Sequence, residues 1–272
     1  MVLCRITHLG AACLLIACSG QSAEVDRIGT LQNPRIVECS GVIASRQYTN
    51  TFWVHNDGGR AVLFAITRDG QRIGDFMITG ANLQDWEDIA MDETNNLYIA
   101  DIGNNNRNRA EVAVYQVPEP DLKMPGKILL PKKKWRLRFP DKPFDSEALL
   151  IWQTNGYLVS KVTDDKKAEL YQFSLADQKE PATLEFITKL NIESPVTGGD
   201  ISPDGRLLGI VAKSGAFIFE IAGDVATAGR VKRTHLKFKH NSIEGCCFLP
   251  EGLLATAESK EIFLYSRDAF GQ

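Results

Sequence analysis

The sequence predicts an all-β fold, a five-bladed β-propeller of four-stranded blades closed by an N-terminal strand that completes the last blade. Three observations predict it. Five segments share one pattern, a more polar strand follows each segment except the last, and one strand without a partner of its own precedes the first segment. A repeat of about 40–50 residues with this pattern is typical of propeller blades.

The repeated segment consists of an apolar strand, a tight polar turn, a second apolar strand, a polar loop, and a third strand rich in aromatic and β-branched residues. Short strands whose turns contain Gly, Pro, Asn or Asp favour an all-β fold. The pattern occurs at residues 40–67, 87–117, 147–175, 197–221 and 244–268.

Fourth strands are expected directly after the first four segments, at residues 71–78, 132–140, 182–190 and 230–238. They are more polar, as the outermost strand of a blade should be. The fifth segment has no such successor. We expect residues 26–36 to pair beside "EIFLYSR" at 261–267, because this would close the ring and remove exposed strand edges.

The first residues predict export. Residues 1–17 have a short region carrying Arg5, a brief apolar stretch and then small residues, which is typical of a signal peptide and too short for a membrane span. The run Leu15 to Cys18 resembles the bacterial lipobox, which predicts a lipid on Cys18 and a tether at 18–25. Ser19 after Cys18 favours the outer membrane, and an ordinary signal peptide with a periplasmic product is the alternative. Residues 26–272 are then a single domain.

The composition excludes a nucleic-acid surface. The chain has 272 residues with 44% apolar content, enough for one large core, and 31 basic against 34 acidic residues give a net charge of -3. We expect a monomer that contacts the membrane only through its lipid. Without the leader, Cys39, Cys246 and Cys247 remain beside Cys18, so one disulfide from Cys39 to Cys246 or to Cys247 is a hypothesis.

The first position of the repeat indicates a ring of side chains around the axis. Glu87 to Asp101, Glu147 to Lys161 and Glu244 to Glu258 are each 14 residues apart, so three blades place Glu at one register. The innermost strands line the axis of a propeller. The first blade offers Ser40 at this position, and the fourth offers Thr197 or Asp200 within "TGGD".

Carboxylates that converge on the axis must be compensated. Two of them about 4 Å apart repel by roughly 4 kcal/mol at an effective dielectric constant near 20. They either take up protons or share a cation, and a set of hard oxygen ligands without His or Cys suits Ca²⁺. The alternative is that these Glu side chains cap neighbouring strands, with water in the channel.

The marks "SG" at Ser40, "DWEDIA" at Glu87, "DSEALL" at Glu147, "VTGGDI" at Thr197 and "IEGCCF" at Glu244 resemble the SdiA-regulated family of exported bacterial propellers. More distantly, they are similar to five-bladed calcium-dependent apyrases, which place Ser, Thr and Glu around an axial calcium. The resemblance spans roughly residues 37–267. It implies that the calcium ligands are Ser40, Glu87, Glu147, Thr197 and Glu244.

The loops after the second strands are expected to surround the mouth of this ring. Nearest the axis we expect His55, Asp57, Asp101, Lys161, Lys213 and Glu258, and the full set of predicted ligand-binding residues adds Asn56, Asn104, Arg107 and Arg109. We interpret the mouth as a binding site for a small ligand, a glycan or a protein, with calcium as a structural ion.

The alternative function is calcium-dependent hydrolysis of phosphate esters or phosphoanhydrides. In that case calcium with Lys161, Lys213, Arg107 and Arg109 would hold the phosphate. Asp57 or Asp101 would orient the attacking water. The chain lacks the sequence signatures of a Ser hydrolase, a P-loop and a His-based zinc protease.

Overall fold

The computed structural model describes residues 25–124, 126, 128–162, 166–177 and 181–271. The predicted signal peptide, the lipid on Cys18 and nearly all of the tether lie outside the described residues. In the part of the chain that is described, no helix has the length and apolar character needed to cross a membrane.

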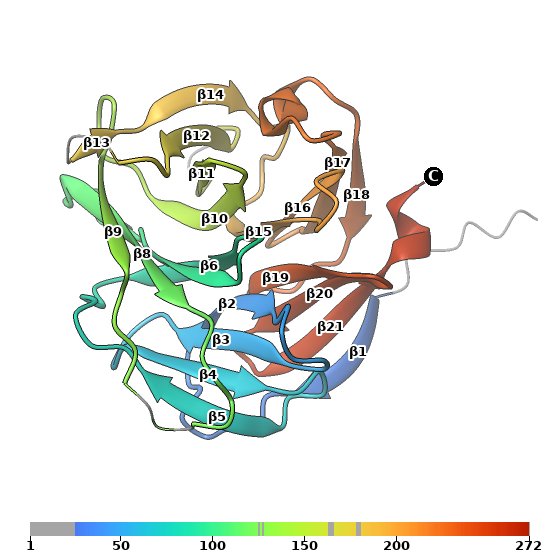
Figure 1. The fold of residues 1–272 in the computed structure, drawn as a ribbon. Helices are drawn as coiled ribbons and strands as arrows, with labels where there is room; N and C mark the ends of the chain where they lie inside the picture. The colour runs from blue at the N-terminus through green and yellow to red at the C-terminus, as the bar shows by residue number, and fades with distance from the viewer. Residues whose placement is uncertain (1–24, 125, 127, 163–165, 178–180, 272) are drawn as a thin grey trace, which may run out of the picture.

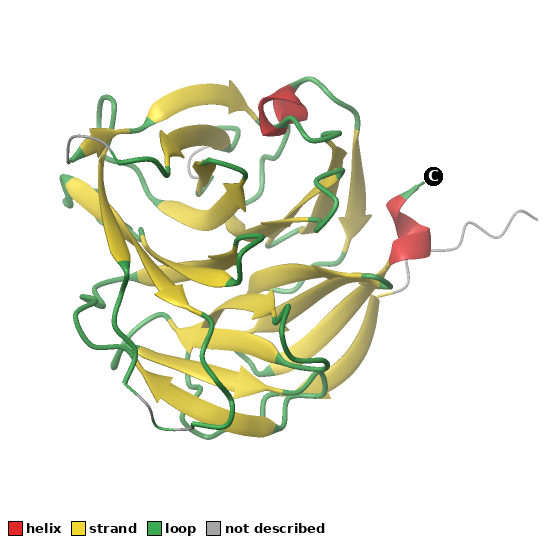
Figure 2. Cartoon of the chain, in the orientation of Figure 1, coloured by secondary structure: helices red, strands yellow, loops and turns green. Residues whose placement is uncertain are grey.

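The described chain forms five antiparallel sheets around a common axis, which confirms the predicted five-bladed propeller (Figure 1). The inner strands contact one another in ring order, from β2 through β6, β10, β15 and β19 back to β2. Strands dominate the chain, and its only described helices are two short 3-10 turns, η1 (Val225–Gly229) and η2 (Arg267–Phe270) (Figure 2).

Each sheet runs from an inner strand at the axis to an outer strand at the perimeter. Blade one contains β2 (Cys39–Ala44), β3 (Phe52–Asn56), β4 (Val62–Ile66) and β5 (Arg72–Met77). Blade two contains β6 (Trp86–Met91), β7 (Asn96–Asp101), β8 (Glu111–Pro118), β9 (Lys133–Arg138) and the short β13 (Ala182–Thr183). Blade three contains β10 (Ser146–Trp152), β11 (Asn155–Ser160), β12 (Glu169–Ser174) and β14 (Glu185–Lys189). Blade four contains β15 (Val196–Ile201), β16 (Leu207–Ala212), β17 (Gly215–Glu220) and β18 (Arg233–Lys237).

Blade five combines the two ends of the chain, as the sequence predicts. Its strands β19 (Ile243–Leu249), β20 (Gly252–Ala257) and β21 (Glu261–Ser266) are completed by β1 (Val25–Thr30). The register places Val25 opposite Tyr265 and Thr30 opposite Glu261. The pairing leaves no free edge on β21, so the ring is closed by hydrogen bonds rather than by packing alone.

The predicted outer strand at 182–190 is divided between two blades. Ala182 and Thr183 form β13, which pairs in parallel with β9 of blade two, and only β14 completes blade three. The physical reason is burial. Ala182 and Leu184 pack into the apolar cluster around Trp135 and Leu137, and the amide of Leu184 donates to the carbonyl of Arg138 (2.9 Å).

Glycines allow the inner strands to approach closely. A Cβ at Gly245 would lie 2.4 Å from the carbonyl oxygen of Ser40, and one at Gly41 would lie 2.6 Å from the amide nitrogen of Ile89. Both separations are far below van der Waals contact. The side chains just before Gly41 and Gly245, at Ser40 and Glu244, are therefore brought close together at the axis.

The three cysteines of the described chain are free and buried, so the proposed disulfide from Cys39 is not formed. The pairing register gives the reason. Gly245, not Cys246 or Cys247, is level with Thr256, and the Cys39 side chain hydrogen-bonds to Thr256. Burial raises the pKa of the Cys39 thiol to about 12, so it remains protonated at neutral pH.

Candidate functional site

The five predicted ring positions lie at one recurring irregularity of the inner strands. In blades two to five, Glu87, Glu147, Thr197 and Glu244 are the residues at which the pairing register between first and second strand shifts. In blade one the shift spans Ser40 and Gly41. Such an irregularity re-aims a side chain that regular alternation would place elsewhere. Each blade therefore presents one extra side chain at the same level.

A repeated hydrogen bond fixes the rim above this ring. In each blade, the carbonyl two residues before the ring position accepts a hydrogen bond from the amide of a residue that follows the second strand, at 2.8 to 3.1 Å. The five amide donors belong to Asp57, Gly103, Lys161, Lys213 and Glu258. Four of these five are residues that the sequence places nearest the axis.

The ring and its rim enclose a small acidic cavity of about 110 Å³. We call it the axial cavity. Six carboxylates and one lysine contribute to its wall. Its lining residues are Glu38, Cys39, Ser40, Asp57, Glu87, Asn105, Glu147, Lys161, Glu244 and Glu258.

Two of the three ring glutamates are compensated by lysines from the rim. Lys161 forms an ion pair with Glu147 and lies 3.6 Å from Asp145, and Lys213 forms an ion pair with Glu244. The ring therefore obtains part of its positive charge from its own loops. Lys161 and Lys213, which the sequence assigns to ligand binding, contact ring carboxylates in the structure.

The carboxylates around Glu87 form two groups that share this residue. The first comprises Asp57, Asp85 and Glu87, and the second comprises Glu87, Asp145 and Glu147; within each group one oxygen per residue lies within 4.8 Å of the others. Gly103 makes room for the first group, since a Cβ there would lie 2.2 Å from Glu87 Oε1 and 2.3 Å from Asp85 Cγ.

Burial and mutual repulsion perturb these acids. Burial raises the pKa of Asp57 to about 7, and the neighbouring Asp85 adds to the rise. The pKa of Glu87 is raised mainly by burial and further by Glu147 and Asp57. Burial also raises the pKa of Glu147 to about 7, against the opposing effect of Lys161. At neutral pH the site thus favours uptake of positive charge, as protons or as a cation.

Asp85 and Asp145, the acids that join the ring glutamates in these groups, can be recognised in the sequence by their spacing. Asp85 and Asp145 both stand two residues before a ring glutamate, in "DWE" and "DSE", and Glu38 stands two residues before Ser40. These are the residues whose carbonyls accept the repeated rim hydrogen bond. The predicted ligand set omits them because it compares single ring positions and not the residues around them.

The structure distinguishes the two alternatives for blade four. Thr197 occupies the ring position, is 1% exposed, and its Oγ1 has no hydrogen-bond partner among the described residues. Asp200 instead accepts hydrogen bonds from the amides of Ile201 (2.8 Å) and Phe248 (2.8 Å), and so links the inner strands of blades four and five. Thr197 is the residue of blade four that matches the ring glutamates.

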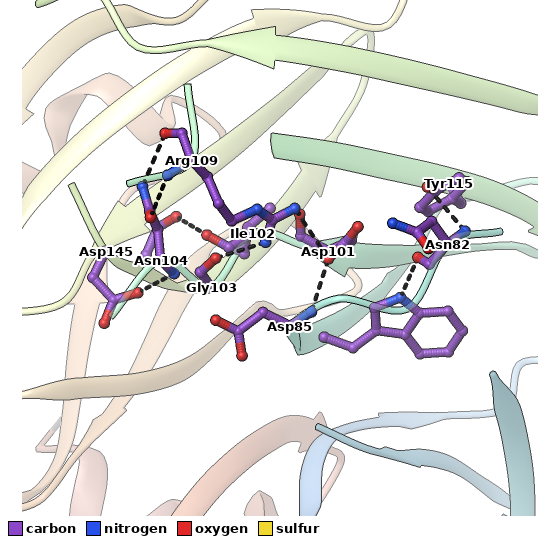
Figure 3. Close-up of polar contacts among 11 residues, drawn as sticks. Asn82, Asp85, Asp101, Ile102, Gly103, Asn104, Arg109, Tyr115 and Asp145 are labelled. Atoms are coloured by element: carbon purple, nitrogen blue, oxygen red, sulfur yellow. Dashed lines mark hydrogen bonds and ion pairs between the residues drawn. The ribbon is translucent and has the colours of Figure 1, made fainter. Parts of the chain in front are cut away.

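Asp101 and Arg109 form a buried structural pair beside the ring (Figure 3). Asp101 Oδ1 lies 3.2 Å from Arg109 and accepts a hydrogen bond from the Asp85 amide (3.0 Å). Arg109 also donates to the carbonyls of Asp101 (3.0 Å) and Gly103 (2.6 Å). Neither residue lines the axial cavity. The pair holds the 101–109 loop and, through it, the backbone of Asp85 and Gly103.

Arg109→Ala is therefore expected to destabilise the fold by about 3 kcal/mol or more, because it leaves the Asp101 carboxylate buried without its charge partner. Urea denaturation followed by tryptophan fluorescence measures the change. Arg60→Ala, at an exposed arginine of the blade-one mouth loop, should cost less than about 0.5 kcal/mol. Equal and small effects of the two substitutions would contradict the structural assignment of Arg109.

The other predicted ligand-binding residues divide into buried and exposed. His55 is fully buried, contacts Trp86 edge-to-face at 5.7 Å, and burial lowers its pKa to about 4, so it is neutral at physiological pH. Asn56 binds the backbone of Arg35, Val37 and Glu38, which ties the chain entering blade one. Two predicted residues lie on the 101–109 loop. Asn104 is buried and hydrogen-bonds to Asp145 and Arg109, whereas Arg107 is exposed.

The fold and the axial cavity define the class of protein: a five-bladed β-propeller whose mouth is lined by carboxylates. No family model and no curated protein matches the chain. Among solved structures, a PQQ-bound aldose sugar dehydrogenase from Streptomyces coelicolor is similar, with a TM-score of 0.51, 11% identity, and coverage of 89% of this chain and 98% of the other.

The propeller of Dos1 is also similar, with a TM-score of 0.42 and 12% identity. That match covers 80% of this chain, and the chain spans about half the length of the Dos1 structure, 52%. At these identities the likeness concerns the fold.

Proposed function

We propose that the protein is a calcium-binding propeller that acts as a ligand-binding module at its axial mouth. The observation that carries the proposal is the convergence of Ser40, Glu87, Glu147 and Glu244 from four blades on the axial cavity, with Thr197 at the equivalent register position of blade four. The expected calcium ligands are Ser40, Glu87, Glu147, Thr197 and Glu244, with Asp57 and Asp85 available beside them.

The chemistry of the donors supports calcium over other metals. All of these groups are carboxylate or hydroxyl oxygens, which Ca²⁺ accepts in numbers of about six to eight at flexible angles. The buried Thr197 Oγ1, which lacks a partner among the described residues, is a further oxygen in need of one. The two lysines lower the negative charge of the ring, but Asp57, Asp85 and Glu87 have no ion-pair partner among the described residues.

The contacts of the rim favour binding over hydrolysis. A phosphohydrolase would need Lys161 and Lys213 for the phosphate and a free carboxylate to orient water. Both lysines contact ring glutamates, and Asp101 pairs with Arg109. Asp57 lines the cavity, whereas Arg109, a third residue expected to hold the phosphate, pairs with Asp101 and does not line it.

We further propose that the protein belongs with the SdiA-regulated exported propellers, is lipid-anchored through Cys18, and resides at the outer membrane or in the periplasm. The lipobox-like run before Cys18 and the five ring motifs support this proposal. A fatty acid on Cys18, measured by mass spectrometry after expression in a two-membrane bacterium, tests the anchor.

Glu87→Gln tests the calcium site in two directions. Glu87 belongs to both carboxylate groups, so replacing it with neutral Gln should raise the melting temperature in EDTA by about 2 °C or more. The same substitution should weaken the affinity for calcium at least tenfold. Thermal denaturation across a calcium titration measures both. Glu185→Gln, on exposed β14, is the matched control and should change neither. If calcium does not change the melting temperature of the unmodified protein, the proposed calcium site is refuted.

A further inference from the structure

Beside the axial mouth lies a second recess of opposite charge. It is a groove of about 420 Å³ at the top of blade four, which we call the basic groove. Its described lining includes Lys213, His235, Lys237 and Lys239, and contains no carboxylate. The groove opens on the same face as the ring, because the turn from β16 to β17 and the connection from β18 to β19 both lie on that face.

The sequence "KFKH" at 237–240 explains why two lysines point outward here. Phe238 packs inward against Phe263 (5.0 Å between ring centroids) and Tyr265 (6.0 Å). Since successive side chains of an extended chain face opposite sides, the flanking Lys237 and Lys239 are both directed to solvent. Both are exposed, and neither forms an ion pair with a described residue.

The floor of the groove is ordered by His235. Its ring stacks on Phe217 at 4.2 Å with an interplanar angle of 12°, and its Nε2 lies 3.2 Å from the carbonyl oxygen of Ser214. This contact fixes the 213–215 turn that carries Lys213. Lys213 in turn contacts Glu244 of the ring and the carbonyl of Asn241 (2.6 Å). Lys213 thus lines the basic groove and contacts Glu244, which lines the acidic axial cavity.

We propose that the basic groove binds a phosphate or carboxylate group of a small acidic ligand, with Lys237 and Lys239 as its charge partners. This deepens the proposed function, since it gives the chemical class of the ligand at the mouth. Charge-assisted hydrogen bonds from lysine to an oxyanion are among the stronger ones in proteins. The unpaired lysines on a partly recessed, acid-free surface supply them without first breaking an internal ion pair.

Isothermal titration calorimetry with inorganic phosphate and with glucose 6-phosphate, at low ionic strength on protein freed of calcium by a chelating resin, tests the groove without calcium. We expect binding by the unmodified protein and at least tenfold weaker binding by the Lys237→Ala/Lys239→Ala variant. The control is Lys123→Ala/Lys232→Ala, which removes the same charge from two exposed lysines elsewhere and should retain full affinity. Calcium-dependent melting of the same variants is recorded in parallel.

Three outcomes overturn the proposal: no phosphate binding, equal loss in both double variants, or binding to phosphatidylglycerol vesicles through Lys237 and Lys239 without binding of either small anion. The last result would replace the small ligand with a membrane surface. The calcium response separates this proposal from the one on which it builds. Phosphate binding through the groove with no response to calcium would retain the anion site and reject the ion.

Discussion

Asp88→Ala is expected to destabilise the protein by about 4 kcal/mol or more, a larger effect than that of Arg109→Ala. Asp88 is fully buried, and its carboxylate accepts hydrogen bonds from the amides of Ile89 (2.8 Å), Leu149 (2.9 Å) and Gly199 (3.2 Å). One side chain of blade two thereby links the inner strands of blades three and four. Its removal leaves three buried amides unpaired, at about 1–3 kcal/mol each.

Asp88→Asn should be nearly as damaging, because an amide nitrogen would face amide donors at one of the two oxygen positions. Urea denaturation measures both variants. The control is Asp141→Ala, at an exposed acid of the mouth face. A loss near 4 kcal/mol corresponds to a fall in melting temperature of about 8–16 °C for a chain of this size. A fall below about 2 °C for Asp88→Ala would show that other contacts hold the inner strands in place.

The sequence was sufficient for the fold because the repeat constrains it strongly. Five segments with one pattern and one unpartnered N-terminal strand admit few arrangements, and β1 pairs with β21 as expected. The ring position was also accessible, since Glu87, Glu147 and Glu244 align without any structural knowledge. What the alignment could not reveal is its physical basis, a shift of strand register that places these side chains at the axis.

Equal spacing along the sequence does not identify equivalent positions when hairpins differ in length. Glu87 and Asp101 are 14 residues apart, as are Glu147 and Lys161. In the strand pairing, however, Asp101 lies opposite Trp86 as Ser160 lies opposite Ser146, and Ser160 is only 13 residues from Glu147. The hairpin of blade two is one residue longer, so Asp101 is the last residue of β7, and a further residue, Ile102, separates it from Gly103 at the rim. One inserted residue in a strand hairpin thus converts an expected ligand into a buried ion-pair partner.

Charge balance is the other property that a single sequence does not give. Repulsion among the ring carboxylates predicts protons or a cation, yet Lys161 and Lys213 already compensate two of them. Lys161 and Glu147 lie 14 positions apart in one blade, whereas Lys213 of blade four pairs with Glu244 of blade five, 31 positions away, so the second pair depends on how neighbouring blades meet. The sequence pattern places both lysines at the mouth but does not pair them with glutamates of the ring.

In EDTA, the stability of the protein is expected to fall as pH rises from 4.5 to 7.5. Asp57 and Glu147 have folded-state pKa values near 7, above the value near 4 of an unfolded acid. In this window the folded state binds more protons than the unfolded state, so the free energy of unfolding decreases with pH. Asp75 and Glu111, whose pKa values are lowered by arginines, lose their contribution only below this window.

Calcium should remove most of this loss, since a cation bound by the ring stabilises its ionised carboxylates and competes with protons for them. We expect calcium to raise the melting temperature by about 5 °C or more at pH 7.5 and by less than about 1 °C at pH 4.5, measured by calorimetry. Partly buried Asp200, whose pKa is raised to about 7 by desolvation, contributes a fall with pH that calcium should not reverse, because its carboxylate binds the amides of Ile201 and Phe248 and not the ring. Calcium stabilisation of equal size at both pH values would place the ion at some site other than these carboxylates.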